Sequence, residues 1–454
     1  MRLHYLVCVG IAFAPAVTLG QPSTPAPLAS TALASTNGLR LMPATLSQYP
    51  ASPPVAEPIL AGHPQPPGRT LADLEGMALA NNPTLTRSAA RVDAARGQWL
   101  QVGLKPNPVI GYMGNQIGDQ GRAGQQGGFV QQEIVTAGKL RLNRDVAAQE
   151  IRQTEQQFEA QRLRVLNDVK LSFYDVLVAE RMLSLTQELL RVGEQGVKAA
   201  DGLLAAKEVS RVDLLQARVE LGSARIVAEN TRNRYIAAWR KLAAVLGVPD
   251  MAPVPLIGDL NAGLAEIEWS AALQGILTSS PELAAAQAGV WRAQRAIARA
   301  RVEPRPNIEA MAGAQHDYGS GYDLVNVQVG IPIPFFNRNQ GNLRKAVAEL
   351  AAAQTDVRRL ELDLQQRLAA AYERYANARQ QVNRYAHDIL PDAKASLALV
   401  DGGYRQGEFG YLTLLTAQRT FFQTNIAYLE SLRQLRESSV TIEGLLLTDS
   451  LQQP

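Results

Sequence analysis

The side chains best suited to chemistry are few in this chain and widely separated. Four histidines and one cysteine occur among 454 residues. A metal site or a nucleophile–base pair needs its members clustered at short, fixed spacings. We therefore expect no enzyme activity, no cofactor and no metal held by this chain. The five residues lie in an N-terminal apolar stretch, a proline-rich stretch, a turn and a helical stretch: His4, Cys8, His63, His316 and His387.

Charged and polar side chains gather instead at two turns that are 200 residues apart, 207–211 and 407–411. Glycines in the second turn and Ser210 in the first, a residue able to cap a helix, predict tight connections between helices. An apolar heptad pattern starts directly after each turn. We expect the two turns to lie together, at the end of the molecule far from the strands.

The two turns belong to an internal repeat. Asn-Asn-Pro-Thr-Leu at 81–85 returns as Ser-Ser-Pro-Glu-Leu at 279–283, and the segment 212–218 returns at 412–418. Two copies of so long a unit predict a duplicated architecture. The predicted organisation is a first repeat at 70–250, a linker at 251–267, a second repeat at 268–448 and a tail at 449–454.

Each repeat has the same predicted order: a helix, a break containing proline, a β-hairpin with a glycine-rich turn, and a long helical stretch. Thr70 is predicted to cap the first helix, with Asp73 as the acidic residue three positions on. The predicted helices are 70–104 and 268–303, the strands 107–117, 127–136, 307–317 and 322–333, and the long helical stretches 139–247 and 338–448.

The last predicted strand alternates most clearly between apolar and polar residues. Val325, Val327 and Val329 would share one face, and Asn326 and Gln328 the other. The apolar face could pack on a soluble core or contact lipid; four strands of about ten residues match outer-membrane strands. Four strands cannot close a barrel in lipid, so three copies would be needed to give twelve.

The long helical stretches carry apolar residues at heptad spacing, which is typical of coiled coils. Two stripes on one helix predict a neighbour on each side, as in a closed ring of helices. A four-helix bundle has the same periodicity, but a helix of about 50 residues would be about 75 Å long. The stripes are Leu343, Leu350, Val357 and Leu364, with Val347 and Leu368; Leu166, Val169, Phe173 and Val176; Leu171, Val178, Leu185 and Leu189; and Val212, Leu215, Val219 and Ile226.

The N-terminal region predicts export. Residues 1–20 read as a signal peptide with a short apolar stretch, and lipidation at Cys8 is the alternative. Residues 21–69, rich in Pro, Ala and Ser, predict a disordered tether. The formal net charge of +3 is too small for a nucleic-acid binder. No later stretch reads as a transmembrane helix.

This order of elements resembles the TolC-like outer membrane efflux protein family over about residues 70–448. The resemblance rests on Asn82-Pro83-x-Leu85, Pro106-Asn107-Pro108, Pro306-Asn307, Val212-Asp213-Leu214-Leu215-x-Ala217 and Tyr404-Arg405-x-Gly407…Leu414-Leu415-x-Ala417. The segment 332–341 resembles the strand-to-helix junction of the heavy-metal branch, the CzcC-like and CusC-like channels.

The resemblance implies a mixed α/β membrane protein. Three chains would form a twelve-stranded outer-membrane β-barrel, four strands each, continuous with a long periplasmic α-helical barrel. Outer-membrane lipid, a periplasmic adaptor and an inner-membrane cation/proton antiporter pump are the implied partners. No nucleic acid is expected.

The resemblance also implies two sets of residues at the tip, one for a pore gate and one for adaptor docking. Asp213 could instead be an ordinary exposed acid at a helix N-terminus, and Phe409 could pack on the neighbouring tip rather than meet a partner. Because Thr413 and Thr416 stand where relatives can carry acids, a ring of carboxylates is in doubt. The gate set is Arg211, Asp213, Tyr404, Arg405, Thr413 and Thr416, and the docking set is Lys207, Glu208, Val209, Gly407, Glu408, Phe409 and Gly410. On the barrel, Asn326 and Gln328 would face the lumen and Val325, Val327 and Val329 the lipid.

The predicted function is an outer-membrane exit duct of a tripartite resistance-nodulation-division efflux system that passively conducts heavy-metal cations. The same fold could serve multidrug efflux or type I secretion. A soluble periplasmic coiled-coil adaptor or scaffold is the alternative from another class, and it predicts a monomer extractable without detergent.

Overall fold

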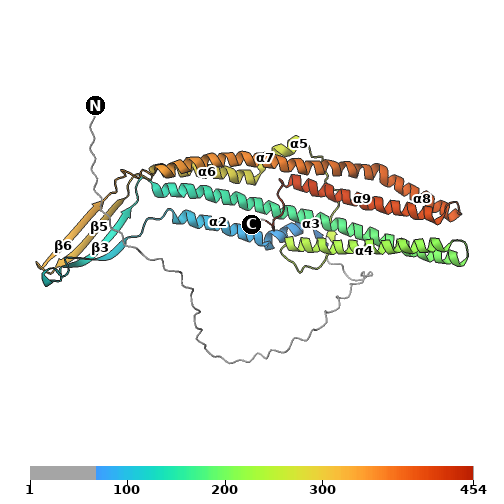
Figure 1. Cartoon of the computed structure of the whole chain (residues 1–454), viewed down its shortest axis with the longest axis horizontal. Helices are drawn as coiled ribbons and strands as arrows, with labels where there is room; N and C mark the ends of the chain where they lie inside the picture. Colours follow the sequence, from blue (N-terminus) through green and yellow to red (C-terminus); the bar gives the residue numbers. More distant parts are fainter. Residues whose placement is uncertain (1–67, 453–454) are drawn as a thin grey trace, which may run out of the picture. The chain divides into compact units, whose positions relative to one another are not determined.

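The computed structural model of this chain describes residues 68–452. The predicted signal peptide and nearly all of the predicted tether lie outside the described residues. Within them, both halves of the chain have the same order of helices and strands (Figure 1). The first half contains β1 (Arg69–Thr70), α1 (Leu71–Asn81), α2 (Pro83–Gln101), β2 (Val109–Asn115), the 3₁₀ turn η1 (Asp119–Gly121), β3 (Gln125–Ile134), α3 (Lys139–Ala205) and α4 (Arg211–Val245). The second half contains β4 (Leu256–Ile257), α5 (Trp269–Ser279), α6 (Pro281–Val302), β5 (Ile308–Asp317), β6 (Tyr322–Gly330), α7 (Gln340–Arg384), the π-helical turn η2 (Tyr385–Ile389), α8 (Leu390–Gln406) and α9 (Tyr411–Glu443).

The first helix of each repeat is two helices, not the single helix expected over 70–104 and 268–303. The breaks fall at Asn82 and Ser280, whose ψ of 119° in both cases leaves the helical region. Each residue ends one helix, caps the next through its side chain, and is followed by a proline at the first helical position. A proline restricts the residue before it to extended conformations, which explains both breaks.

The predicted capping of the first helix by Thr70 is confirmed. The Thr70 side chain accepts a hydrogen bond from the Asp73 amide, and the Asp73 carboxylate accepts one from the Thr70 amide at 2.9 Å. This reciprocal capping box satisfies two amides that a helix start leaves without partners. It fixes the first turn of α1.

The two long helical stretches differ in continuity. In the first repeat α3 runs unbroken for 67 residues. In the second repeat the π-helical turn at Tyr385–Ile389 separates α7 from α8, and the amide of Leu390 donates to the Tyr385 carbonyl five residues earlier. Pro391, which has no amide hydrogen, follows at once. Among residues 68–452, no helix combines the length and hydrophobicity that crossing a membrane requires.

The two β-hairpins join into one antiparallel sheet with the order β2-β3-β5-β6. The central pairing, β3 with β5, runs from Gln125 opposite Asp317 to Ile134 opposite Ile308. Strands β2 and β6 therefore form the two edges. The observed strand limits differ from the predicted ones by up to three residues: β3 starts two residues earlier than predicted, and the other differences shorten the strands.

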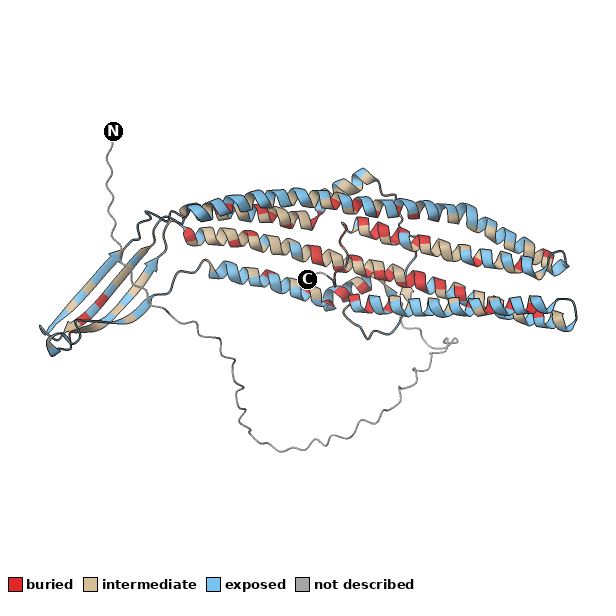
Figure 2. Ribbon diagram, viewed as in Figure 1, coloured by how far each residue is buried: buried red, intermediate tan, exposed pale blue. Residues whose placement is uncertain are grey.

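The helices pack side by side in the order α2, α3, α6, α7 next to the sheet, and α4, α3, α9 toward the two turns (Figure 1). Buried side chains concentrate midway along the helices, where α1 packs on α3 and α5 on α7 (Figure 2). The predicted stripe through Val169, Phe173 and Val176 is buried there. The stripe on α4 is instead exposed, by 51–67%, along its whole length: Val212, Leu215, Val219 and Ile226.

Candidate functional site

The two tip turns have the same backbone geometry. Lys207 and Gly407 both adopt the left-handed conformation, with φ of 59° and 79°. The amide of the following residue, Glu208 or Glu408, donates to the carbonyl five residues earlier, at 2.9 and 2.8 Å. This is the hydrogen bond that closes many helix C-termini. A left-handed backbone conformation is readily accessible to glycine, as at Gly407, whereas Lys207 adopts it despite its side chain.

Asp213 is held by the turn that precedes it. Its carboxylate accepts hydrogen bonds from the Ser210 amide at 2.9 Å and the Ser210 hydroxyl at 2.8 Å, and its own amide donates back to the Ser210 hydroxyl. The hydroxyl and amide bonds from Ser210 lower the pKa of Asp213 below its ordinary value. Ser210 thus caps α4, and the Asp213 carboxylate completes the capping box and keeps its negative charge into mildly acidic solution.

On the second helical hairpin, formed by α8 and α9, the gate candidates make mostly local contacts. Arg405 forms an ion pair with Asp401, one turn earlier on α8, at 2.8 Å. The Thr416 hydroxyl donates to a backbone carbonyl of its own helix. The rings of Tyr404 and Tyr411 lie 6.2 Å apart at their centroids. The remaining gate candidates are exposed: Arg211 and Thr413.

Tyr411 connects the two helical hairpins, α3–α4 and α8–α9, a role that the sequence pattern did not reveal. Its hydroxyl lies 2.9 Å from the position that a Cβ on Gly196 of α3 would occupy, so a larger residue there would require the Tyr411 side chain to shift. Its ring packs on a small buried cluster that includes Leu214. Burial raises the pKa of the Tyr411 hydroxyl, and the nearby Tyr404 and Glu220 of α4 raise it further. An ion pair between Arg419 and Glu220, at 3.8 Å, joins α9 to α4 as well.

The docking candidates form the outermost surface of the two turns. Phe409 is 42% exposed, and the buried part of its ring lies against Gly403 of α8. The ring therefore packs in part on its own helical hairpin and leaves the remainder exposed. Val209 is half-buried, and the remaining members are exposed: Lys207, Glu208, Gly407, Glu408 and Gly410.

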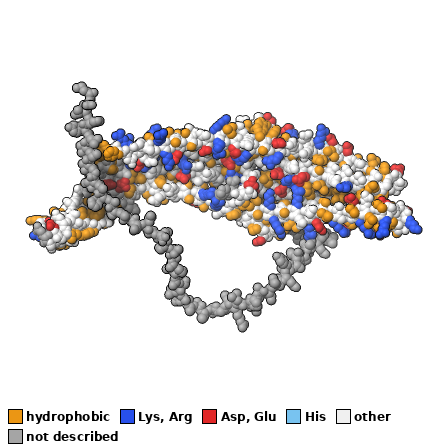
Figure 3. Space-filling model, viewed as in Figure 1, with side chains coloured by type: hydrophobic (Ala, Val, Ile, Leu, Met, Phe, Trp, Pro, Cys, Tyr) orange, Lys and Arg blue, Asp and Glu red, His pale blue; other side chains and the backbone are white. Residues whose placement is uncertain are grey.

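One face of the sheet is apolar across all four strands. Val325, Val327 and Val329 are exposed by 77, 75 and 67%. Each lies opposite an alanine of β5 in the strand register. The same face continues across Val130 of β3 to Ile110 of β2. Figure 3 shows hydrophobic side chains along the margins of the strand region and both signs of charge mixed over the helices.

The opposite face of the sheet mixes polar with apolar side chains, among them Phe129 and Met311. Alternation along β6 places Asn326 and Gln328 on this face, opposite Gly313 and Met311 of β5. On the same face Gln315 is buried and accepts a hydrogen bond from the Asn115 side chain at 3.3 Å. The two faces of the sheet therefore differ in polarity, most clearly along β6.

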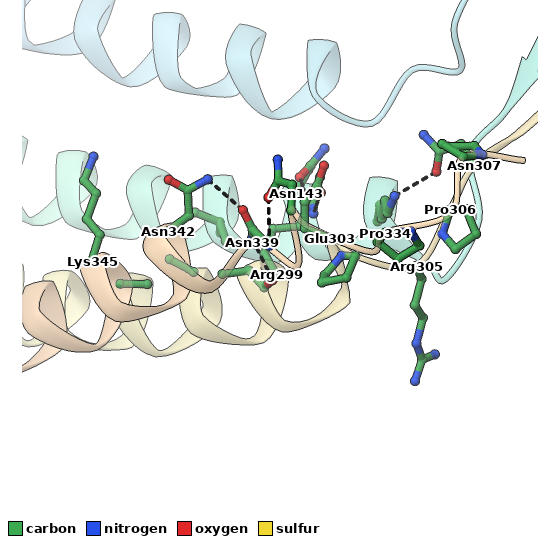
Figure 4. Close-up of a pocket in the computed structure, with 18 of the residues that line it drawn as sticks. Asn143, Arg299, Glu303, Arg305, Pro306, Asn307, Pro334, Asn339, Asn342 and Lys345 are labelled. Carbon is green, nitrogen blue, oxygen red and sulfur yellow. Dashed lines mark hydrogen bonds and ion pairs between the residues drawn. The ribbon is translucent and has the colours of Figure 1, made fainter. Parts of the chain in front are cut away.

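A cavity of about 1160 Å³ lies where the sheet meets the helices (Figure 4). Lys139, only 5% exposed, donates to the Asn307 side chain at 2.9 Å, and Asn307 donates to Glu133 at 2.6 Å. Arg299 donates to Asn143 at 2.6 Å (Figure 4). These bonds tie the second repeat to the start of α3. The sequence marks Asn307 as a repeated residue but not as part of this network.

In the part of the chain that the structure describes, no group of three or more His, Cys, Asp or Glu side chains is placed to hold a metal ion. His316 contacts Asp323 at 2.8 Å, and His387 contacts the Asn383 carbonyl at 3.0 Å. Both contacts are local.

The model of the outer membrane efflux protein family matches residues 74–248 and again 272–446. The chain therefore belongs to the outer membrane efflux protein family. The match in two successive segments also identifies both halves as copies of one family unit.

Individual relatives agree with this assignment. The cobalt-zinc-cadmium resistance protein CzcC of Cupriavidus metallidurans is 28% identical over 83% of this chain and 90% of its own. The cation efflux system protein CusC of Escherichia coli K12 is 25% identical over 80% of this chain and 83% of its own.

Solved structures share the fold. A crystal structure of CusC matches with a TM-score of 0.70 at 20% identity, over 84% of this chain and 92% of that chain. The open state of the MtrE outer membrane channel of Neisseria gonorrhoeae matches with the same TM-score at 20% identity, over 83% and 89%. The chain is thus an outer-membrane efflux protein with a channel fold, located in the outer membrane and extending into the periplasm, and it is not an enzyme.

Proposed function

We propose that three copies of this chain form the outer-membrane exit duct of a resistance-nodulation-division efflux system, and that the duct passes heavy-metal cations. The observation that carries the substrate class is the similarity to CzcC, which covers 83% of this chain and 90% of CzcC. A duct passes its cargo without binding it tightly, so conduction requires no cluster of metal ligands in this chain.

The free edges of the sheet support a trimer. An unpaired edge strand is unstable in lipid, because its backbone groups have no hydrogen-bond partners there. Since β2 and β6 run antiparallel to one another, β6 of one chain can pair with β2 of the next. Three chains then close a ring of twelve antiparallel strands. The exposed stripe on α4, from Val212 to Ile226, would likewise be covered by a helix of a neighbouring chain.

The apolar face of the sheet has the dimensions of a membrane-facing band. The alternate positions from Val325 to Ile333 cover about 26 Å of extended chain. A strand tilt of about 40° reduces this to about 20 Å of height. Phe335 and Phe336, 70% and 94% exposed, follow at the helix end and extend the band toward the roughly 25 Å of outer-membrane strands. Asn326 and Gln328 then face the water-filled lumen.

We place the periplasmic gate and the adaptor-binding surface at the two tip turns. Asp213 would contribute three negative charges to the constriction of a trimer, and Arg405 three positive ones that are paired within their own helix. The half-exposed ring of Phe409 would be covered by a periplasmic adaptor, which in turn binds the inner-membrane cation/proton antiporter pump. The supporting observation is that the two hairpins differ chemically although their backbones agree.

Deletion and complementation in the native host test the substrate. Loss of this chain should lower the tolerated concentration of zinc, cobalt or cadmium by severalfold, and the wild-type gene should restore it. Tolerance of organic solvents and hydrophobic drugs should not change. The opposite pattern would assign the duct to multidrug efflux, and unchanged tolerance of both classes would refute the proposal.

A further inference from the structure

Four exposed arginines form a ladder along one flank of α4. They recur at intervals of seven residues, and the first three directly precede exposed apolar residues of the α4 stripe. In coiled coils, charged residues beside an apolar seam at this spacing set the choice and the orientation of the partner helix. The pattern predicts that α4 packs on a further helix that carries carboxylates beside its own apolar side chains. The ladder is Arg211, Arg218, Arg225 and Arg232, and the apolar residues are Val212, Val219 and Ile226.

The ladder has no close acidic partner within one chain. The guanidinium of Arg218 lies 4.0 Å from the carboxylate of Asp201 on α3. Arg225 lies at the same distance from Glu194 of α3, and all four side chains are more than half exposed. Exposed pairs of this length contribute little to stability. The other charged residues of this flank make no ion pair or hydrogen bond with any residue in 68–452: Arg211, Glu229 and Arg232.

α8 presents a face of the complementary kind. One side of α8 and of the π-helical turn before it is exposed at positions three or four residues apart, and it carries two carboxylates and no basic residue. Asp392 makes no ion pair or hydrogen bond within the part of the chain that the structure describes. Asp388 is paired with Arg384 but remains 53% exposed. The members of this face are Asp388, Ile389, Asp392, Ala395, Ser396 and Leu399.

α4 and α8 lie on opposite edges of the layer of helices. α4 packs mainly on α3 and α8 mainly on α9, and α3 contacts α9 between them (Figure 1). α8 lies on the edge that continues α7 and the strand β6, and α4 on the edge of α2 and the strand β2 (Figure 1). The ring closure that pairs β6 with β2 of the next chain therefore also brings α8 against α4 of that chain.

The two helical hairpins stand at nearly the same height. Arg419 contacts Glu220 at 3.8 Å, and these residues are eight and nine residues from the starts of α9 and α4. Rotation about a trimer axis along the helices leaves each residue at its own height. Arg225 and Asp392 are each fourteen residues from the tip end of their helix, about 21 Å. Asp392 of one chain thus lies level with Arg225 of the next.

We propose that α4 of one chain and α8 of a second copy of this chain form an antiparallel seam, with Arg225 paired to Asp392 and Val219 packed on Leu399. Val219 and Leu399, 66% and 75% exposed, are eight and seven residues from the tip ends of their helices. The inference rests on the proposed trimer. It adds which helix covers the α4 stripe and which charges hold the two helices together.

Cysteine cross-linking of the purified, detergent-solubilised full chain tests the contact. In Val219→Cys/Leu399→Cys, mild oxidation should link more than half of the chains into disulfide-bonded dimers and trimers on a non-reducing gel. The wild type, whose only cysteine is Cys8, gives the background. The control Val219→Cys/Val347→Cys places the second thiol at an exposed position of α7 near the sheet, and it should give less than a tenth of that yield.

The native mass of the unoxidised protein, measured by light scattering, separates this inference from the proposed function. A trimer whose thiols at positions 219 and 399 stay unlinked overturns the seam and leaves the duct standing, whereas a monomer refutes both. Cross-linking in intact cells to a protein of another mass, in place of a second copy, would assign the α4 stripe to the adaptor and also overturn the seam.

Charge exchange tests the ion pair on the same two thiols. Arg225→Glu places a like charge opposite Asp392 and should slow the cross-linking at least threefold in low salt, and the addition of Asp392→Arg should restore the rate. Lys198→Glu makes the same change at an exposed position of α3, seven residues from the tip end of that helix, and should change the rate less than twofold. In 0.5 M salt the rates should converge, because the charges are then screened. Equal slowing by Lys198→Glu, or no recovery in the double exchange, would reject the ion pair.

Discussion

The ion pairs of Glu282 connect three helices and both repeats, and they give a quantitative test of the packing. One carboxylate oxygen contacts Arg164 of α3 at 2.5 Å, and the other contacts Arg367 of α7 at 2.7 Å. The side chains are 18, 15 and 35% exposed, respectively, so solvent screens these contacts only in part. Glu282→Gln keeps the shape, removes the charge, and leaves an amide group facing one guanidinium.

The expected cost follows from the two contacts. A hydrogen bond to a charged group contributes about 1.5–3 kcal/mol, and glutamine retains a single neutral acceptor. Allowing for the partial exposure, we expect a loss of about 2–3 kcal/mol per chain. With an unfolding entropy of about 2.1 cal/mol/K per residue over the described region, this corresponds to a fall of about 3 °C in the unfolding midpoint.

The measurement is thermal unfolding at a fixed scan rate, in low and in 0.5 M salt. Glu349→Gln is the matched control, because it breaks a pair with Lys345 that is 3.6 Å long and exposed by 54% and 72%. Such an exposed helical pair contributes about 0.3–0.5 kcal/mol, so the control should shift by less than about 1 °C and only at low salt. Equal shifts in the two variants, or a Glu282→Gln midpoint within 1 °C of wild type, would refute the reasoning.

Three further outcomes test the gate and the membrane face. Asp213→Asn keeps a capping acceptor but removes the charge, and it should reduce the cation selectivity of single channels in planar bilayers by severalfold. The control Asp73→Asn, at a capping box of the same form on α1, should not change the selectivity. Equal selectivity in both variants removes Asp213 from the gate. Because Ser210 lowers the pKa of Asp213, its charge is lost only as the pH falls through a value below the ordinary 3.8, so wild-type selectivity should persist at pH 4; a decline that begins between pH 5 and 4 contradicts this assignment. The fluorescence of Phe336→Trp should be quenched by brominated lipids and that of Leu399→Trp, an exposed position on α8, should not; the absence of quenching at position 336 would move the membrane boundary away from the junction.

The features that the sequence predicts correctly are those encoded by neighbouring residues. The capping residues Thr70 and Ser210 act over three positions, and the alternation of β6 is a property of the strand itself. The repeat then transfers each local observation from one half to the other. These signals were sufficient for the order of the elements and for the two faces of the sheet.

The features that the sequence pattern missed depend on contacts between distant residues or between chains. The bond from Lys139 to Asn307 joins residues 168 positions apart, and the contact of Tyr411 with Gly196 joins the two repeats. The apolar spacing of the stripe from Val212 identifies a packing face but not the chain that covers it. The helix breaks at Asn82 and Ser280 were readable from the prolines that follow, but the apolar periodicity runs across them.

The π-helical turn before Pro391 has a mechanical consequence. An unbroken helix such as α3 resists bending along its whole length, whereas a helix with a π turn and a proline bends at that point. In the proposed trimer, three stiff columns would alternate with three jointed ones around the pore axis. A load applied at the tips would then bend every second column, with the pivots at the height of Tyr385–Ile389. The tunnel near the tips would therefore widen with threefold rather than sixfold symmetry.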